Sequence, residues 1–350
     1  MDNPAQLMSP AERLRHLLES AILAPSRHNT QPWLFDIEGR ELRVYGDWRR
    51  TLRAADPDGR ELVMACGAAL QNVEVAALQQ GCMASVEILA AGRKDGLLAR
   101  LTLEEARRPT PEDEALHAAI PRRRTDRFAH EVRDVPAALL GTLVREAAQL
   151  GGKVRVIEPG ARPALAELLA EADRAQWSNP RFRAELTSWS RDNLGREGDG
   201  MPSYAHGRSA AGSALHGILM RVSSGVSDEE GRDRHHALHA RVLLALSTDH
   251  DGPADWLSAG RAMQRVLLRA AAHGLSASFF SQAVEVRSAR ARLREELGDR
   301  RYPQVLMRLG YGRPLRATPR RPVAAVLRSF RVDGPQRALA GPVGHAAGGP

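Results

Sequence analysis

The sequence contains little lysine, cysteine or aromatic residue, and each shortage excludes a class of function. Its 350 residues carry a formal charge of +8 and a pI of about 10.3, which alone would suggest a nucleic-acid partner. The cationic residues are nearly all arginine, with Lys94 and Lys153 the two lysines, and they are scattered among acidic residues. Aromatic residues make up 4% of the chain, too few for a platform on which bases could stack. We therefore expect no nucleic-acid partner and assign the arginine excess to codon bias and an anion site.

Cysteine motifs, metal motifs and membrane segments are also missing. Cys66 and Cys82 lack the spacing of a metal or redox site, and two cysteines form no disulfide framework, so we expect both to be reduced and buried. His235, His236 and His239 are clustered, but no acidic residue or cysteine completes a metal-ligand spacing. No apolar stretch could span a bilayer, and the first residues lack the basic and apolar regions of a signal peptide. We expect a cytoplasmic protein with no metal and no membrane partner.

Hydrophobic periodicity and capping patterns predict a chain of alternating helices and strands. A content of 43% hydrophobic and 26% charged residues is typical of a globular chain, and the length predicts two domains or two halves. In the first half we expect a helix from a capping box at Ser9, a second helix from a similar pattern at Asp58, and strands at 33–37, 42–45, 86–89 and 97–103. In the second half we expect helices at 135–147, 165–177, 182–189, 256–273 (capped by Asp255) and 288–297, and strands at 154–157, 241–246 and 305–309. The polar, proline-containing run 104–114 is the best candidate for a joint between the halves.

The most informative stretch is the segment Ala24-Pro-Ser-Arg-His-Asn-Thr-Gln-Pro-Trp33, which lies between a helix and a strand. Pro25 must end the helix and Pro32 restricts the chain again, so a stiff loop is expected. Between the prolines the loop carries hydroxyl, imidazole and amide groups, which suit a flat heteroaromatic ligand with donors and acceptors. The alternative is a connector whose polar groups satisfy only its own backbone.

A second informative stretch is Arg122-Arg-Arg-Thr-Asp-Arg-Phe128. Its arginines and the hydroxyl of Thr125 can converge on one phosphate, because guanidinium groups form forked, charge-assisted hydrogen bonds. In a chain so rich in arginine, a solvated basic turn is the alternative.

Both stretches match motifs of a known family. Ala-Pro-Ser-x-x-Asn-x-Gln-Pro-Trp resembles the flavin-ring loop of the nitroreductase family, and the His-Asn-Thr-Gln-Pro-Trp form resembles its Acg-like, tandem-fused branch. The arginine stretch resembles the family's Arg-Arg-Ser-x-Arg-Phe phosphate motif, with threonine replacing serine. Thr318-Pro-Arg-Arg-Pro322 resembles the C-terminal basic phosphate contact. The Trp-x-x-x-Gly and Gly-Leu-x-Ala patterns ahead of Phe280 resemble the segment that faces the flavin N5 edge, although the usual Glu-Gly is absent.

This resemblance implies an α+β nitroreductase-like fold, bound FMN, and NAD(P)H as a co-substrate. No catalytic side chain is assigned, because the flavin would carry the chemistry. The residues that the resemblance assigns to the cofactor come from four segments: Pro25, Ser26, His28, Asn29 and Gln31; Arg123, Arg124, Thr125 and Arg127; Phe280, Ser281 and Gln282; and Arg320 and Arg321.

The helix–loop–strand order of residues 14–37 recurs at 135–157, but each copy lacks part of the site. The second loop, 149–152, has no polar motif, and no arginine motif precedes the first helix. The family assembles its site across two subunits. The resemblance therefore implies two fused halves, 1–115 and 116–330, that form an intramolecular pseudo-dimer with one complete flavin site, with further homodimerisation left open. We also expect a lid insertion at about 191–234 and a disordered tail at 331–350.

Three functions are compatible with these features. The first is hydride transfer from NAD(P)H through FMN to a small electron acceptor, nitroaromatic or quinone-like. The second is storage of FMN under a closed lid without turnover, which the long insert favours. The third is a relic of the fold that binds no flavin.

Overall fold

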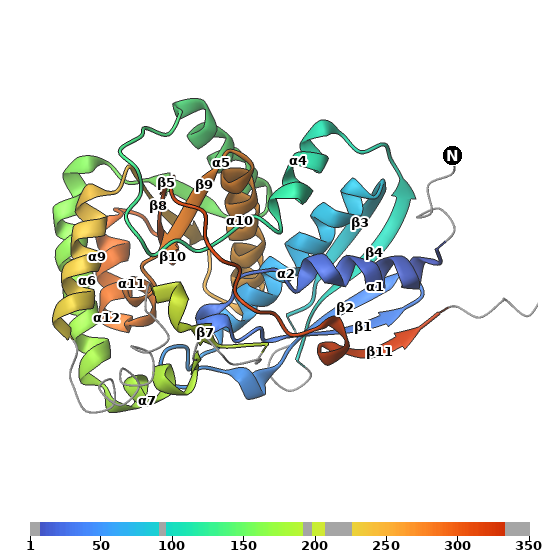
Figure 1. Cartoon of the computed structure of the whole chain (residues 1–350), viewed down its shortest axis with the longest axis horizontal. Helices are drawn as coiled ribbons and strands as arrows, with labels where there is room; N and C mark the ends of the chain where they lie inside the picture. The colour runs from blue at the N-terminus through green and yellow to red at the C-terminus, as the bar shows by residue number, and fades with distance from the viewer. Residues whose placement is uncertain (1–7, 91–95, 192–197, 207–225, 333–350) are drawn as a thin grey trace, which may run out of the picture.

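The chain folds into two β-sheets that are separated by a pair of long central helices (Figure 1). The computed structural model describes residues 8–90, 96–191, 198–206 and 226–332. The first sheet has the order β11–β1–β2–β4–β3, with strands Leu327–Arg331, Trp33–Glu38, Glu41–Gly46, Leu97–Ala106 and Cys82–Ile88. The second has the order β5–β8–β10–β9, with strands Lys153–Val156, Val242–Thr248, Tyr302–Tyr311 and Leu275–Phe279. The predicted α+β class is confirmed.

The α-helices of the described residues form a central pair and two flanking groups. The central pair is α2 (Arg60–Gln79) and α10 (Pro253–Ala272). Around the first sheet and the central pair lie α1 (Pro10–Ala21), the shorter α4 (Pro111–Ala119) and α5 (Ala137–Gln149). A lateral group beside the second sheet contains α6 (Arg162–Ser178), α7 (Pro180–Ser188), α9 (Val226–His239), α11 (Gln282–Glu285) and α12 (Arg287–Glu296). The described residues also form a short parallel pair of β6 (Ser190–Arg191) and β7 (Met201–Pro202).

Two segments of the chain have the same topology. The segment α1-β1-β2-α2-β3-β4 forms four antiparallel strands in the order first, second, fourth, third. The segment α5-β5-β8-α10-β9-β10 forms four antiparallel strands in the same order, with α6, α7 and α9 inserted between its first two strands. The long helix between the second and third strands has 20 residues in each segment. The predicted boundary near residue 115 remains a prediction.

The two central helices approach closely because glycine lies at their crossing. A Cβ atom on Gly67 would clash with the carbonyl oxygen of Leu257, and one on Gly260 would clash with that of Met64. Polar pairs flank this crossing, with Arg261 and Glu74 in contact at 2.7 Å. Glycine, which has no Cβ, allows the two backbones to come this close. Among the described residues one helix, α2, is long and apolar enough to cross a membrane, and most of it is buried in this core.

The last strand joins the first sheet. β11 pairs in parallel with β1, with Phe35 opposite Leu327, so residues 312–326 must cross from the second sheet to the first. This crossing places the 318–322 segment beside the loop that follows α1 (Figure 1). Segments separated by almost 300 residues therefore share one region of the molecule.

The local predictions were confirmed in most places, and two helix starts differ from them. Ser9 forms the predicted capping box of α1. Asp58 does not cap α2, because Gly59 is the N-cap residue at φ 77° and the Asp56 carboxylate accepts from the Leu62 N–H instead. α10 begins at Pro253, three residues before the predicted Trp256, because Asp255 accepts from the Gly252 N–H at the helix start.

The remaining predictions concern the cysteines, the joint between the halves, the lid and the tail, and the described residues test only some of them. Cys66 and Cys82 are free and buried, as expected. The expected joint at 104–114 contains the end of β4 and the capped start of α4, which packs on both central helices. Most of the expected lid, residues 192–197 and 207–225, and the expected tail from 333 onwards lie outside the described residues.

Candidate functional site

A loop of unusual backbone conformation follows α1. In this loop, residues 24–33 and called here the Ser26 loop, His28, Asn29 and Gln31 have φ angles of 50°, 55° and 50°. Left-handed backbone costs about 1 kcal/mol or more for residues with a side chain, and such residues concentrate at functional sites. The Ser26 hydroxyl accepts from the Gln31 N–H at 2.9 Å and closes the loop on itself. The loop is therefore held in one strained conformation.

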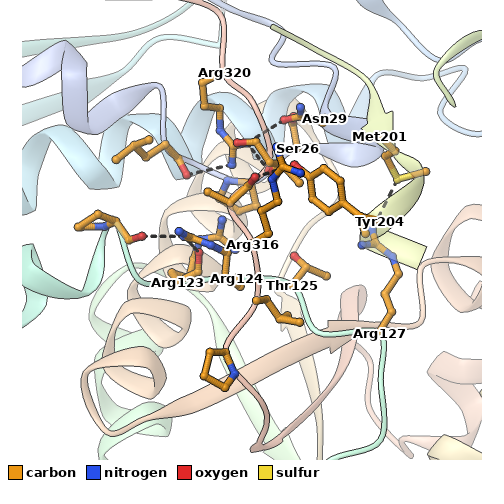
Figure 2. A pocket seen from close by; sticks show the side chains of 18 of the residues that line it. Ser26, Asn29, Arg123, Arg124, Thr125, Arg127, Met201, Tyr204, Arg316 and Arg320 are labelled. Atoms are coloured by element: carbon orange, nitrogen blue, oxygen red, sulfur yellow. Dashed lines mark hydrogen bonds between the residues drawn. The ribbon is translucent and has the colours of Figure 1, made fainter. Parts of the chain in front are cut away.

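The arginine loop, residues 122–128, lies opposite the Ser26 loop. An isolated parallel bridge joins Thr125 to Ala277 on β9, and the Asp126 N–H donates to the Ala277 carbonyl at 2.7 Å. These bonds fix the arginine loop beside the second sheet. The two stretches singled out in the sequence thus face each other across one cavity of about 470 Å³, the arginine pocket (Figure 2).

The arginine pocket contains a buried cation without an anion. Arg123 is 6% exposed, and its Nε and Nη1 atoms have no hydrogen-bond partner within the described residues. Burial, together with the charges of Arg320 and Arg124, lowers the pKa of Arg123 to about 9. An arginine side chain stays protonated at neutral pH, so the charge remains and its solvation is missing. The pocket is built for an anionic ligand group.

Arg320 extends this cluster from the far end of the chain. Its Nη1 atom donates to Asn29 Oδ1 at 3.1 Å, and its Nη2 atom donates to the carbonyls of Leu23 and Ala24 at 3.3 and 3.2 Å. Burial and then the Arg124 charge lower the pKa of Arg320 to about 10. These bonds place Arg320 in the wall of the pocket, in agreement with its predicted position.

A short segment from the expected lid region covers the arginine pocket. This covering segment, residues 198–206, contributes Met201, Tyr204 and Ala205 to the lining. It is attached to the Ser26 loop, since Gln31 Nε2 donates to the Gly198 carbonyl at 2.7 Å and Asn29 Nδ2 donates to the Gly200 carbonyl at 2.9 Å.

The covering segment is also fixed electrostatically and by packing. The Asp199 carboxylate is ion-paired with Arg50 and with Arg191. The Tyr204 hydroxyl donates to the Ala317 carbonyl at 2.7 Å, while the Arg316 guanidinium lies 4.6 Å from the Tyr204 ring centre. The covering segment therefore joins the Ser26 loop to the crossing chain before β11.

A second space opens behind the arginine pocket. It consists of two adjoining cavities of about 120 and 100 Å³, together called the inner chamber. Four residues line both the arginine pocket and the larger of these cavities: Pro25, Ser26, Thr125 and Arg127. The far wall of the larger cavity is apolar, with side chains from both central helices and from β10: Met64, Ala65, Met263, Val305 and Leu306.

The described residues place most of the predicted site residues in these spaces. All but three line the arginine pocket or the inner chamber. Phe280 is the first exception; it is buried in the lateral core and its neighbour Phe279 lines the chamber instead. Gln31 and Arg321 are the others; the Gln31 side chain accepts from the Arg321 N–H at 2.8 Å, and the Arg321 Nη1 donates to the Gln31 carbonyl at 3.0 Å. These two bonds hold the Ser26 loop on its side away from the pocket.

Two predicted contacts need a different role. The Asn29 amide was expected to meet a flavin ring, but its Nδ2 and Oδ1 atoms are used by Gly200, Pro319 and Arg320. The Asn29 side chain thus joins the Ser26 loop to the covering segment and to the crossing chain before β11. Gln282 lines the smaller cavity, where its Nε2 donates to Asp233 at 2.9 Å.

Other lining residues were not expected from the sequence. Tyr204 and Arg316 lie in segments without motif resemblance, and Glu61 was interpreted as part of a helix start. A glutamate that caps a helix and one that lines a site cannot be told apart by their position in the sequence pattern. Within the described residues no group of three His, Cys, Asp or Glu side chains could hold a metal ion.

Comparison with known proteins agrees with these motifs. No protein-family model matches the chain. A Mycobacterium tuberculosis protein named as an NAD(P)H nitroreductase, Rv3131, is 34% identical over 324 residues, which is 91% of each chain. The chain belongs to the NAD(P)H nitroreductase family. The nitroreductase named acg from the same organism is 29% identical over 330 residues, covering 91% of this chain and 96% of the relative.

Solved nitroreductase structures cover a smaller share of the chain. The FMN-dependent nitroreductase NfnB of Mycobacterium smegmatis, solved with NADPH, is 22% identical, with a TM-score of 0.41; the match covers 62% of this chain and 99% of NfnB. A nitroreductase with bound FMN from Desulfitobacterium hafniense is 14% identical, with a TM-score of 0.37; it covers 59% of this chain and 94% of that protein.

Proposed function

We propose that this nitroreductase-family chain binds FMN and transfers hydride from NAD(P)H to a nitroaromatic or quinone-like acceptor. The observation that carries the proposal is the buried, unpartnered guanidinium of Arg123 beside Arg124 and Arg320. A phosphate dianion would supply the missing charge and hydrogen-bond acceptors. FMN is also the cofactor named for the solved relative NfnB.

The residues present suit the two ends of FMN. Arg123, Arg124 and Arg320, with the Thr125 hydroxyl, would hold the phosphate in the arginine pocket. The inner chamber would hold the isoalloxazine between its apolar wall and the Ser26 loop. When bound, FMN would supply the hydride chemistry, and the protein would supply position and electrostatics.

The inner chamber also suits an aromatic acceptor, which would span its two adjoining cavities and so reach the wall that Glu61 lines. In the smaller cavity, Trp177 and Phe182 pack edge-to-face, with ring centres 6.2 Å apart. Aromatic walls favour flat apolar ligands, while Arg127 and Arg232 in the same wall suit the oxygens of a nitro or quinone group.

We also infer that one chain performs the role of two nitroreductase subunits, as an intramolecular pseudo-dimer. The matched strand orders of the two topological segments and the glycine crossing of α2 and α10 support this inference. So does the division of the site, because the Ser26 loop comes from the first segment and the arginine loop precedes the second. The expected stoichiometry is one FMN per chain.

Storage of FMN without turnover is the second candidate. The bonds between the covering segment and the Ser26 loop favour it, because they close the arginine pocket on one side. Whether NAD(P)H reaches the flavin separates the two functions.

The test is an anaerobic absorbance measurement on purified protein loaded with FMN. Rapid bleaching of the flavin band by NADPH would support the oxidoreductase. Bleaching by dithionite but not by NADPH would support storage, and Asp199→Asn, which weakens the attachment of the covering segment, should then admit NADPH. A protein that takes up no FMN would contradict both and leave the flavin-free relic.

A further inference from the structure

We infer that Glu61 is the acid of the inner chamber and donates a proton to the acceptor that is reduced there. This inference rests on the proposed oxidoreductase function and adds a catalytic side chain to it. The sequence alone offered no acid–base group for the site.

Glu61 is positioned by the first turn of α2 and lines the larger cavity of the inner chamber. Its Oε1 atom accepts from Arg60 Nη2 at 3.2 Å, while its buried Oε2 atom has no hydrogen-bond partner among the described residues. The same chamber shares lining residues with the arginine pocket, where Arg123 Nε and Nη1 have no hydrogen-bond partner among the described residues. One carboxyl oxygen thus accepts no hydrogen bond from the described residues and lies beside the space where a ligand would bind.

A second carboxylate competes with Glu61 for the nearest cation. Arg27 Nε lies 2.6 Å from Glu285 Oε1 but 3.8 Å from Glu61 Oε2. Gln176 also donates to Glu285, at 2.5 Å, and the Glu285 side chain is 1% exposed. Arg27 therefore pairs closely with Glu285 and only loosely with Glu61.

The charges that face Glu61 come from every neighbouring element. They are Arg60 on α2, Asp56 before it, Arg27 on the Ser26 loop, and Glu285 on α11. Burial, followed by the Glu285 charge, raises the pKa of Glu61 well above its usual value, against the opposing effect of Arg60 and Arg27. A carboxyl group with a raised pKa keeps its proton to higher pH and can donate it to a bound ligand.

The reaction needs such a donor. Reduction of a quinone to a hydroquinone takes two electrons and two protons. NAD(P)H supplies both electrons and one proton as a hydride equivalent and leaves as NAD(P)⁺. The O–H bond of Glu61 breaks as a new O–H bond forms on the quinone oxygen, and the Glu61 carboxylate then regains its proton from water. Glu285 touches neither cavity of the chamber; it is a positioning residue whose negative charge contributes to the raised pKa of Glu61.

The experiment compares wild type, Glu61→Gln and Glu285→Gln, each loaded with FMN, with menadione as the acceptor. Loss of the Glu61 acid should lower kcat near neutral pH by roughly 100-fold or more. It should also abolish the alkaline limb of the kcat profile. Glu285→Gln removes a neighbouring negative charge, so the pKa of Glu61 falls and the alkaline limb moves to lower pH. Infrared difference spectra give a second readout, since the wild type should show a protonated carboxyl band near neutral pH that Glu61→Gln lacks.

Each outcome is decisive. An alkaline limb that persists in Glu61→Gln would assign the proton to His28 or to solvent and overturn the inference, as would an infrared band unchanged by Glu61→Gln. If Glu61→Gln does not fold, the direction of the shift in Glu285→Gln decides. Protein without flavin, or flavin that NADPH does not reduce, would instead contradict the proposed function, and flavin content is measured separately.

Discussion

Arg320 donates a hydrogen bond to Asn29 over 3.1 Å, joining the segment before β11 to the loop after α1. The bond exists because the last strand pairs with the first sheet rather than with the second. A cationic side chain of the C-terminal crossing thereby completes a pocket to which the loop before α5 contributes Arg123, Arg124 and Arg127. The pairing of β11 with β1 therefore also brings Arg320 into the pocket.

The first prediction concerns the unpartnered cation. Arg123→Met should stabilise the ligand-free protein by about 1–3 kcal/mol, because it removes a buried charged group whose hydrogen bonds are missing. The same change should weaken FMN binding by at least ~10-fold, since a charge-assisted bond to phosphate is lost. Denaturant unfolding and FMN titration measure the two effects. Arg122→Met is the matched control, because Arg122 is exposed and bonds to the Ala118 carbonyl outside the pocket; equal effects of both substitutions would contradict the assignment.

The second prediction concerns Asn29, whose side chain joins three segments of the pocket wall. Asn29→Ala should destabilise the protein by roughly 1–3 kcal/mol, because the carbonyls of Gly200 and Pro319 lose a donor and Arg320 loses an acceptor. Asn29→Asp keeps the acceptor for Arg320 and adds a negative charge beside the arginines. It should therefore bind FMN more weakly than the wild type even where its thermal stability is retained. FMN affinity of Asn29→Asp equal to that of the wild type would refute the role of the arginines as a phosphate site.

The third prediction tests the contact between the central helices. Gly260→Ala should cost about 1–3 kcal/mol or more, because its Cβ meets the Met64 backbone, which cannot rotate away as a side chain can. Gly231→Ala, in helix α9 with open space around it, should instead be neutral or stabilise by up to about 1 kcal/mol. Unfolding curves of both variants decide; similar stability for the two would show that the crossing is looser than described.

The fourth prediction concerns acid stability. Although burial opposes it, hydrogen bonds from Arg290, Trp256 and Gln304 hold the pKa of Asp251 at about 2. A carboxyl group with a lowered folded-state pKa stabilises the fold above its unfolded value of 3.8, and this stabilisation disappears as the pH falls toward 2. Asp251→Asn should therefore cost about 1–2 kcal/mol at pH 7, after allowance for partial exposure.

Its control lies two residues away. Asp249 is 62% exposed and pairs with Arg301 at the surface, so Asp249→Asn should change stability by less than about 0.5 kcal/mol. The difference in unfolding free energy between wild type and Asp251→Asn should disappear between pH 4 and pH 2. A gap that is independent of pH would show that the loss comes from packing.

Local sequence signals predicted the elements well where chemistry is local. The capping box at Ser9 depends on a few adjacent residues, and it is present in the structure. The partnership of the Ser26 loop with the arginine loop came from family resemblance and not from periodicity. Their predicted contacts with a flavin remain predictions.

The missed residues have physical reasons. Adjacent residues of extended chain point to opposite sides, so the Phe279 side chain lines the chamber while that of Phe280 is buried in the lateral core. The same alternation turns Arg320 into the pocket and Arg321 toward the back of the Ser26 loop. Glu61 competes with Glu285 for Arg27 only once three distant segments have come together in the folded chain, which no short-range pattern encodes.

The most direct test of the account is the number of FMN molecules bound per chain. Anaerobic titration of the flavin-free protein, followed by absorbance and by light scattering for the mass of the bound species, measures it. The account predicts one FMN for each chain, lost in Arg123→Met and retained in Arg122→Met. Two FMN per chain, one per pair of chains, or none would contradict a single site built from the Ser26 loop and the arginine loop of the same chain.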